Sequence, residues 1–451
     1  MNQAAARAIA EAALKRVDPV RMITDCVTLN GDRLSIQTEA DSLTVDLNDF
    51  RRIIVVGAGK AGASMAYGLE QVLGDRIETG LVVVKYDHLR DLNRIELLEA
   101  GHPVPDESGV AASRRIVELA ESADEQTLCL VLISGGGSAL LTLPAAGDQG
   151  EVTLQDTQET TQLLLEAGTP IQEINCIRKH ISSVSGGRFC RILQPATTVS
   201  LILSDVVGDE LESIASGLTC ADPTTFEDAW AVAEKYRIAD RLPKRVRALL
   251  EAGRAGRAQE TPKPGDPAFE RVHNVLIGTN ALALDAARRA AEKLGFHTAV
   301  LTSQLTGEAR EIARVFSAMA KELAASDAGF LSKPACVLAG GETTVTVTGT
   351  GKGGRNQEMA LAFLSEVAAR PSRFEGVTFL STATDGNDGP TDAAGAFASV
   401  AVAEAADDAE LSIGRTLNDN DSYHFFERID ALYKTGPTNT NVCDLQILLV
   451  E

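Results

Sequence analysis

The chain has 451 residues and a formal net charge of −21 at pH 7. Nucleic acid is not an expected partner of so acidic a chain, because phosphate backbones are held by basic surfaces. The longest apolar runs, such as Leu128–Ile133, are too short to cross a bilayer, so no membrane partner is expected either. The seven cysteines include no C-x-x-C pair, which favours a reducing cytoplasm over a disulfide framework or a zinc site.

Short apolar strands alternate with amphipathic helices from the N-terminus onward. The first helix is expected at Met1–Val17, and further helices at Ala61–Leu73, Gly109–Ser122, Thr157–Ala167 and Ile171–Ser183. Buried strands are expected at Ile53–Val56, Leu81–Val84, Leu128–Ile133 and Val199–Leu203. This alternation predicts right-handed βαβ units and a sheet covered on both faces.

Residues 255–267 break the pattern, since they hold three prolines and two glycines. Such a composition is typical of a linker. The alternation resumes after it, so we predict an α/β fold of two domains, each a mostly parallel sheet covered by helices. The predicted parts are a Rossmann-like first domain (1–254), a linker (255–267) and a second domain (268–451), with an active-site cleft between the domains. In open parallel sheets ligands bind beyond the carboxyl ends of the strands.

Two glycine loops follow strands of the first domain. Residues 57–62 form G-x-G-x-x-G with Lys60 inside, which fits a phosphoryl group, a carboxylate or, with Asp87 beyond the next strand, a dinucleotide. Ser134-Gly135-Gly136-Gly137-Ser138 offers backbone amides and two hydroxyls, which predicts a cradle for phosphate or carboxylate. A tight packing turn is the structural alternative for both loops.

Arg178 and Lys179 lie together on the helix expected at Ile171–Ser183. On a very acidic chain they are candidate ligands for an anionic substrate, although a solvated helix face explains them equally well.

Acidic residues occupy two further strand ends. Asp205 follows Val199–Leu203, and Asp385 and Asp388 follow a strand expected at Val377–Leu380. Carboxylates in this setting fit Mg²⁺, which takes one or two carboxylates with phosphate oxygens and water. Helix capping and Asx-turns are the structural alternative.

The second domain carries the densest glycine loop. A strand expected at Thr343–Thr348 leads into residues 349–354, which contain four glycines, and a helix is expected to begin near Asn356. Cations in a glycine loop at a helix start predict a polyanion, most simply a nucleotide phosphate. The candidate nucleotide-binding residues here and in the polar segment 436–442 are Glu342, Gly351, Lys352, Gly353, Gly354, Asn356 and Asn441.

Taken in order, the motifs resemble those of the glycerate 2-kinases, the MOFRL-type glycerate kinases. The motifs concerned are residues 57–62, 101–106, 134–138, 178–180, 204–209, 222–225, 340–358 and 384–388. The resemblance implies phosphorylation of D-glycerate at its 2-hydroxyl by ATP with Mg²⁺, giving 2-phospho-D-glycerate and ADP. It also implies that Lys60 and Arg355 are the key lysine and arginine of the family.

The resulting hypothesis for the site has four parts. Lys60, Arg355 and Asp205 are the expected catalytic residues, and one of the acids is expected to accept the hydroxyl proton without the sequence saying which. Substrate or phosphate is expected on Gly59, Ser134, Gly135, Gly136, Gly137, Ser138, Arg178 and Lys179. The metal is expected on Asp205, Asp385 and Asp388. We expect a cytoplasmic monomer or homodimer.

Two other functions remain open from the sequence. A reductase that uses NADH or NADPH on hydroxypyruvate would explain residues 57–62 and Asp87. A non-catalytic regulator that binds a sugar phosphate would also use glycine loops.

Overall fold

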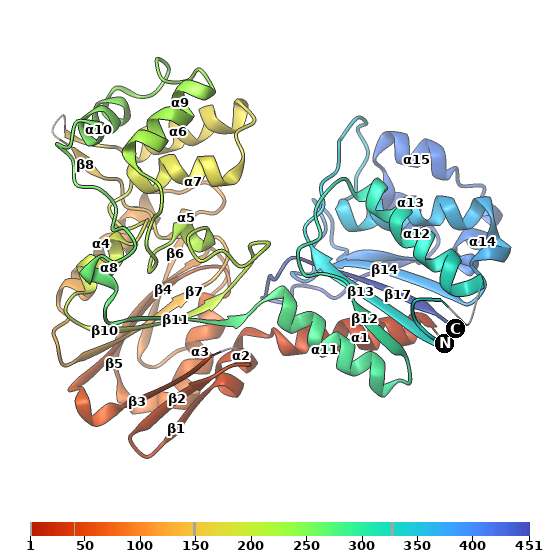
Figure 1. The fold of residues 1–451 in the computed structure, drawn as a ribbon, viewed down its shortest axis with the longest axis horizontal. Coiled ribbons are helices and arrows are strands. Elements are labelled where there is room, and N and C mark those ends of the chain that lie inside the picture. The colour runs from red at the N-terminus through yellow and green to blue at the C-terminus, as the bar shows by residue number, and fades with distance from the viewer. Residues whose placement is uncertain (1, 40, 148–149, 326–328) are drawn as a thin grey trace. The chain divides into compact units, whose positions relative to one another are not determined.

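The computed structural model describes residues 2–39, 41–147, 150–325 and 329–451 (Figure 1). The chain divides into two compact units. The N-terminal unit comprises residues 19–204 and 209–277, and the C-terminal unit comprises residues 1–18, 205–208 and 278–451. This division differs from the predicted domains at both ends, because residues 1–18 join the second unit and residues 255–277 stay with the first.

A six-stranded sheet forms the centre of the N-terminal unit, in the order β11-β10-β7-β4-β5-β6. Neighbouring strands from β10 to β6 pair in parallel, as predicted. The strands are β4 (Arg52–Ala58), β5 (Ile77–Lys85), β6 (Ile95–Ala100), β7 (Thr127–Ile133), β10 (Thr197–Leu203) and β11 (Val272–Gly278). Helices α3 (Gly62–Leu73), α4 (Glu107–Glu121) and α8 (Arg188–Leu193) accompany them. The carboxyl ends of β4 and β7 therefore lie side by side.

Two smaller parts complete the N-terminal unit. An antiparallel sheet of β1 (Val27–Asn30), β2 (Arg33–Gln37) and β3 (Ser42–Asp46) follows α2 (Pro19–Cys26) and was not predicted. A helical group has its own apolar core, which includes Leu164, Ile177, Trp230 and Leu250. Its helices are α6 (Leu154–Glu166), α7 (Ile171–His180), α9 (Phe226–Lys235) and α10 (Lys244–Arg254), next to α5 (Gly137–Leu140) and the short strands β8 (Ala146–Gly147) and β9 (Gly150–Glu151).

The predicted linker, residues 255–267, is packed into the N-terminal unit. Thr261 is 1 % exposed, and its hydroxyl donates a hydrogen bond to the Asp222 carboxylate at 3.0 Å. Arg191 pairs with Asp266 at 2.6 Å. The prolines of this segment thus fix a packed loop and do not mark a free connection.

The C-terminal unit contains the second six-stranded sheet, in the order β12-β13-β17-β14-β15-β16. Its strands are β12 (His297–Val300), β13 (Ala335–Gly341), β14 (Val377–Ala383), β15 (Gly395–Ser399), β16 (Leu432–Tyr433) and β17 (Asp444–Val450). Helices α1 (Asn2–Arg16) and α11 (Asn280–Lys293) pack together, whereas α12 (Ala309–Ala325), α13 (Arg355–Ala369) and α14 (Val400–Asp408) form a second group (Figure 1). Helices α15 (Ile413–Asp419) and α16 (Ser422–Arg428) follow.

The strand directions of this second sheet differ from the predicted, mostly parallel arrangement. The β12–β13 pair is parallel, but β13–β17, β17–β14, β14–β15 and β15–β16 are antiparallel. For the β14–β15 pair the physical reason is the short connection between the strands. Residues 384–394 join β14 to β15 without a helix, and parallel neighbours need a longer crossover.

The expected strand at Thr343–Thr348 is absent from the structure. Strand β13 already ends at Gly341, and Thr344 forms only an isolated bridge with Glu308. The β-branched residues in this stretch have no neighbouring strand to pair with. The helix expected near Asn356 is confirmed as α13.

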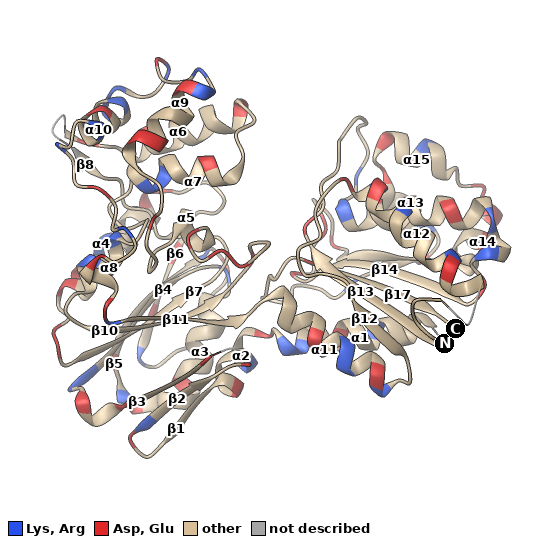
Figure 2. Ribbon diagram, viewed as in Figure 1, with Lys and Arg blue, Asp and Glu red and all other residues tan. Residues whose placement is uncertain are grey.

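Charged side chains of both signs are interspersed along the helices of both units (Figure 2). None of the helices in the described ranges combines the length and the apolar character needed to cross a bilayer.

Candidate functional site

The first two glycine loops interlock at the carboxyl ends of β4 and β7. The Lys60 amide donates to the Gly135 carbonyl at 2.9 Å, and the Ala61 amide donates to the Ser134 hydroxyl at 3.1 Å. Ser134 itself is fully buried. Ser134 therefore holds the two loops together. It does not line the predicted phosphate or carboxylate cradle, which only the neighbouring residues can form.

Packing within the protein explains the glycines of the G-x-G-x-x-G motif. A Cβ placed on Gly57 would lie 2.3 Å from the Leu132 carbonyl oxygen, and one on Gly62 would lie 2.8 Å from a Val82 methyl group. Gly59 has φ +143°, and a Cβ there would lie 2.0 Å from the Ser134 hydroxyl. In a dinucleotide site the second glycine leaves space for the pyrophosphate. Here that space holds Ser134, so the motif does not favour a nicotinamide cofactor.

Three basic side chains gather beside the second loop. Gly136 has φ +83°, and a Cβ on it would lie 2.8 Å from His102 Cδ2 and 3.3 Å from Lys60 Cε. Burial, Lys60 and then Lys85 lower the pKa of His102 to about 4. Within the described ranges no carboxylate forms an ion pair with Lys60 or Lys85. The lysines therefore leave positive potential available for an anion.

The amides of Gly135 and Gly136 add hydrogen-bond donors at this place. Neither amide donates to a group in the described part of the chain. Unpaired amides beside lysine side chains form a suitable cradle for phosphate or carboxylate oxygens. The expected roles of Gly135 and Gly136 are consistent with this geometry.

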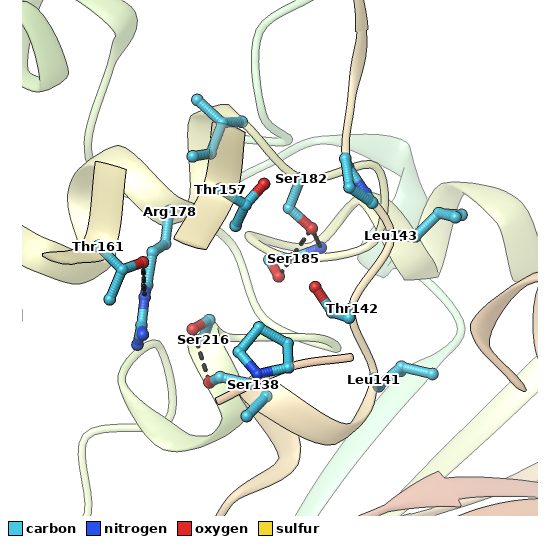
Figure 3. Close-up of a pocket in the computed structure, with 14 residues that line it drawn as sticks. Ser138, Leu141, Thr142, Leu143, Thr157, Thr161, Arg178, Ser182, Ser185 and Ser216 are labelled. Carbon is cyan, nitrogen blue, oxygen red and sulfur yellow. Dashed lines mark hydrogen bonds between the residues drawn. The ribbon is translucent and has the colours of Figure 1, made fainter. Parts of the chain in front are cut away.

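A small pocket rich in hydroxyl groups lies next to that loop (Figure 3). Its polar lining, which we call the hydroxyl pocket, consists of Ser138, Thr142, Thr157, Thr161, Arg178, Ser182, Ser185 and Ser216. The Ser138 and Ser216 hydroxyls lie 2.7 Å apart, and Arg178 Nε is 3.4 Å from the Thr161 hydroxyl. Burial lowers the pKa of Arg178, and no described carboxylate pairs with it. An arginine among hydroxyls fits a small hydroxy acid.

Lys179 and His180 lie away from this pocket, although they follow Arg178 directly. Lys179 is 4 % exposed and pairs with the fully buried Asp222 at 3.4 Å. His180 Nε2 lies 2.9 Å from a Glu260 oxygen. Lys179 therefore stabilises the interior of the unit. Its ammonium group is buried and cannot contact a substrate.

In the C-terminal unit, Arg355 is held by two carboxylates. Its Nε and one terminal nitrogen donate to the two oxygens of Asp444 at 2.5 and 2.9 Å, and the other terminal nitrogen donates to Glu342 at 2.7 Å. Burial raises the pKa of Asp444 to about 7, while Arg355 opposes that rise. Such a bidentate pair fixes the direction of the guanidinium. Glu342 thus lies at Arg355 as a partner of the arginine.

Several predicted residues of this unit converge around Cys443. Its thiol donates to the Asp205 carbonyl at 3.3 Å, and its carbonyl accepts the Thr384 amide at 3.1 Å, next to Asp385. Burial and then the charges of Glu342, Asp444 and Asp205 raise the pKa of Cys443. The Asn441 side chain caps the Cys443 amide at 3.0 Å. The structure thus brings Asp205, Glu342, Arg355 and Asp385 into one region.

The glycine loop at 349–354 packs against its own unit. A Cβ on Gly351 would lie 2.4 Å from Asp421 Cβ, one on Gly353 would lie 2.2 Å from the Ser422 hydroxyl, and one on Gly354 would lie 2.3 Å from Asp388 Cγ. The Lys352 ammonium lies over the Tyr423 ring, 4.4 Å from its centroid. Close packing therefore accounts for these glycines, and their number alone does not indicate a phosphate site.

Asp388 and Asn356 belong to the buried start of α13. The Asp388 carboxylate accepts the Asn356 amide at 3.1 Å and the Gln357 amide at 2.8 Å. Asp388 is 1 % exposed and Asn356 is fully buried. Asp388 thus caps a helix, which is the structural alternative noted for it, and it is not placed to hold a metal. Asn356 likewise cannot reach a nucleotide.

The remaining acids offer a modest fit to Mg²⁺. The described residues contain no group of three or more His, Cys, Asp or Glu arranged to hold a metal ion. Asp385 is half-buried, and one of its oxygens accepts the Asn387 amide at 3.0 Å. Because Mg²⁺ can be held by one or two carboxylates when phosphate supplies the other oxygens, Asp385 and Asp205 fit such a site.

Known proteins similar to this chain cover almost its whole length. Residues 5–251 match the domain of unknown function DUF4147, and residues 335–444 match the MOFRL family. A glycerate 2-kinase from Pyrococcus horikoshii is 38 % identical over 442 residues, which cover 97 % of this chain and 95 % of the relative. The chain belongs to the glycerate 2-kinase family. The resemblance read from the motifs is thereby confirmed.

Two further relatives of this family member bear on its fold and function. A crystal structure of glycerate kinase from Thermotoga maritima is similar with a TM-score of 0.86 at 38 % identity, over 99 % of each chain. This similarity confirms the α/β class and the two-domain architecture. A protein from Agrobacterium vitis named putative hydroxypyruvate reductase is 42 % identical over 402 residues, covering 88 % of this chain and 87 % of the relative.

Sequence reasoning missed three features of the site. His102 lies in a motif that contributed to the resemblance, but its place beside Gly136 depends on the contact between two loops. Asp444 is the first residue of β17 and showed no pattern of its own. Ser216 reaches the hydroxyl pocket from a turn with φ +55°, which no motif marks.

Proposed function

We propose that this protein transfers the terminal phosphoryl group of ATP to the 2-hydroxyl of D-glycerate, giving 2-phospho-D-glycerate and ADP. The observation that carries the proposal is the arrangement of charge in the N-terminal unit. Lysines without carboxylate partners lie beside a pocket that combines hydroxyl groups with Arg178. The names of the relatives, glycerate 2-kinase and D-glycerate 2-kinase, support the same reaction.

Glycerate is a small anion with two hydroxyl groups, and the hydroxyl pocket offers a partner for each. We assign the carboxylate to Arg178, whose fork of donors matches two carboxylate oxygens. The Ser138 and Ser216 hydroxyls are assigned to the substrate hydroxyls. Lys60 and the amides of Gly135 and Gly136 are assigned to the transferring phosphoryl group.

Phosphoryl transfer depends mainly on positioning and on neutralisation of charge. Arg355 supplies positive charge with its direction already set by Asp444. When bound, Mg²⁺ would neutralise charge on the ATP phosphates, and Asp385 and Asp205 are the residues that would hold it. The ATP-binding residues of the C-terminal unit remain predictions from the sequence. Because some of the candidates are buried, we now expect ATP only at the exposed candidates around Arg355.

The cellular setting of the proposal is the cytoplasm. All seven cysteines are free thiols, which is consistent with a reducing compartment. The monomer or homodimer expected from the sequence stays a prediction.

One set of assays tests the proposal against the reductase. ADP release is measured with D-glycerate, L-glycerate, tartronate and hydroxypyruvate side by side, and NADH or NADPH oxidation is followed with hydroxypyruvate. Enolase added to the product identifies it, because enolase dehydrates 2-phosphoglycerate and leaves 3-phosphoglycerate unchanged. We expect ADP release with D-glycerate and a product that enolase consumes. Oxidation of the nicotinamide cofactor without ADP release would overturn the proposal in favour of the reductase.

A further inference from the structure

The His102 imidazole occupies an unusual position in the N-terminal unit. Its Nε2 would lie 2.9 Å from a Cβ on Gly136, so the ring faces the Ser134–Ser138 loop beside the Lys60 stem. Neither ring nitrogen forms a hydrogen bond within the described ranges. The Pro105 that follows three residues later lines the hydroxyl pocket. A half-buried imidazole without an internal partner therefore lies against the loop that carries both the phosphate cradle and Ser138 of the hydroxyl pocket.

We propose that His102 is the catalytic base that removes the proton from the 2-hydroxyl of glycerate. The inference rests on the proposed function and assigns a step within it. The proton passes from the hydroxyl oxygen to the His102 imidazole while that oxygen forms its bond to the γ-phosphorus. The bond between the γ-phosphorus and the bridging oxygen breaks, and ADP leaves with the electron pair. His102 then releases its proton to water.

Asp106, Asp87 and Ser134 are the other groups of the neighbouring loops considered as proton acceptors. The Asp106 carboxylate accepts the Gly109 amide at 2.9 Å and the Tyr86 hydroxyl at 2.7 Å. Asp87 lies in the turn after β5 and is exposed. The hydroxyl of Ser134 is buried and braces the Lys60 loop. Only His102 combines an unpaired basic nitrogen with contact to the loop among these four.

The charges around His102 set its protonation state. Lys60 faces it from the loop after β4 and Lys85 from the end of β5, and both disfavour the imidazolium ion. The imidazole is thus neutral and able to accept a proton at neutral pH. A bound phosphoryl group opposes the lysine charges, so the basicity of His102 rises as the substrates bind.

The first experiment removes the imidazole. With ATP and D-glycerate, His102→Ala should lower kcat by about 10²- to 10⁴-fold, the usual contribution of a positioned base. Added imidazole should restore part of kcat, with a rate that rises as more of the free imidazole is neutral. His273→Asn, on the exposed start of β11, is the matched control and should leave kcat unchanged. A loss below tenfold, or a loss that imidazole does not reduce in a folded variant, would overturn the proposal.

The second experiment keeps His102 in place and alters its surroundings. A required base makes kcat/KM fall as the pH falls through the pKa of the free enzyme's imidazole. Lys85→Gln removes one of the two charges that lower this pKa, so the acid limb should move to higher pH. An unmoved limb, or activity that increases on acidification, would overturn the proposal and make His102 at most a proton donor. If wild-type protein releases no ADP at all, the proposed function has failed instead.

Discussion

Lys60 and Arg355, the two cations that the family resemblance marks, are held in opposite ways. Arg355 in the C-terminal unit donates to Asp444 and Glu342, and Asp444 is fully buried. Lys60 in the N-terminal unit has no carboxylate partner among the described residues, and its charge helps to lower the pKa of His102 and of His88. One cation is neutralised and fixed before any ligand binds, whereas the other keeps its charge available.

Under the proposed function, the difference predicts two kinds of contribution to one reaction. A guanidinium fixed by a bidentate pair loses little freedom when a phosphoryl group arrives, so its benefit is preorganised geometry. An unpaired lysine beside a second lysine contributes attraction, which an anion relieves on binding.

Arg355→Ala should have the largest effect on turnover. If the guanidinium stabilises charge on the transferring phosphoryl group, kcat should fall by about 10³- to 10⁵-fold, as for other phosphoryl-transfer arginines. The measurement is ADP release at saturating ATP and D-glycerate. Arg314→Ala is the control, because Arg314 pairs with Glu311 on an exposed part of α12. A loss below tenfold in folded protein would remove Arg355 from this role.

Lys60→Ala should follow with a loss in kcat of about 10²- to 10³-fold, typical of one donor to a developing charge. The exposed Lys244 at the start of α10 provides the control variant, Lys244→Ala. Steady-state kinetics with D-glycerate separates the two readings of Lys60. An increase in KM with kcat unchanged would show that Lys60 binds substrate and transition state equally.

Asp444→Asn tests whether the fixed direction of Arg355 matters. Breaking a buried ion pair costs about 3 to 5 kcal/mol, so the free energy of unfolding should fall by this order. Turnover should fall about 10- to 100-fold while KM for ATP changes little, because Arg355 remains but is less well directed. Glu342→Gln is the control, since Glu342 is 46 % exposed and a surface pair contributes at most about 1 kcal/mol. Equal effects of the two substitutions would contradict the positioning role.

Arg178→Ala should act on substrate binding. Loss of a charge-assisted contact to the glycerate carboxylate, about 1.5 to 3 kcal/mol, should raise KM for D-glycerate about 10- to 100-fold. The KM for ATP should stay constant. Arg247→Ala, whose side chain pairs with Asp240 on the surface of α10, is the control. An unchanged KM for D-glycerate would place the substrate carboxylate elsewhere.

The adjacent residues Arg178 and Lys179 show what can and what cannot be predicted from the sequence. Both were expected at an anion, and the helix that holds them was predicted correctly as α7. Successive residues of a helix point about 100° apart, so neighbours in sequence face different surroundings. Which of the two faced the pocket depended on Asp222, 43 residues further along, and no local pattern contains that information.

The glycine loops show a second limit of prediction from the sequence. The strands before residues 57–62 and 134–138 were predicted from apolar runs, but the pairing of β4 with β7 that brings these loops together was not. A glycine, however, indicates only that something lies close to the backbone. The group close to Gly59 is the Ser134 hydroxyl, and the group close to Gly353 is the Ser422 hydroxyl. The loop with the most glycines, residues 349–354, is therefore packed against side chains of its own unit.

The strand directions of the C-terminal sheet were similarly beyond the sequence. The apolar run at Val377–Leu380 predicted β14 but carries no sign of direction, since a buried antiparallel strand is as apolar as a parallel one. The insertion of β17 between β13 and β14 sets the pairing. It also places Asp444 at Arg355.

His102 provides the smallest expected effect, on the pH dependence of stability. Its pKa in the folded chain is about 4, below the usual 6.5, because burial and the charges of Lys60 and Lys85 disfavour the imidazolium ion. The unfolded chain therefore takes up a proton that the folded chain refuses. The contribution of His102 to stability is fully present above pH 6.5 and is lost as the pH falls towards 4. Between pH 7 and pH 5, wild-type protein should lose more free energy of unfolding than His102→Asn, as measured by urea denaturation at each pH. Equal losses would mean that the lysines do not act on His102, and the contrast between the unpaired and the paired cation would lose its electrostatic basis.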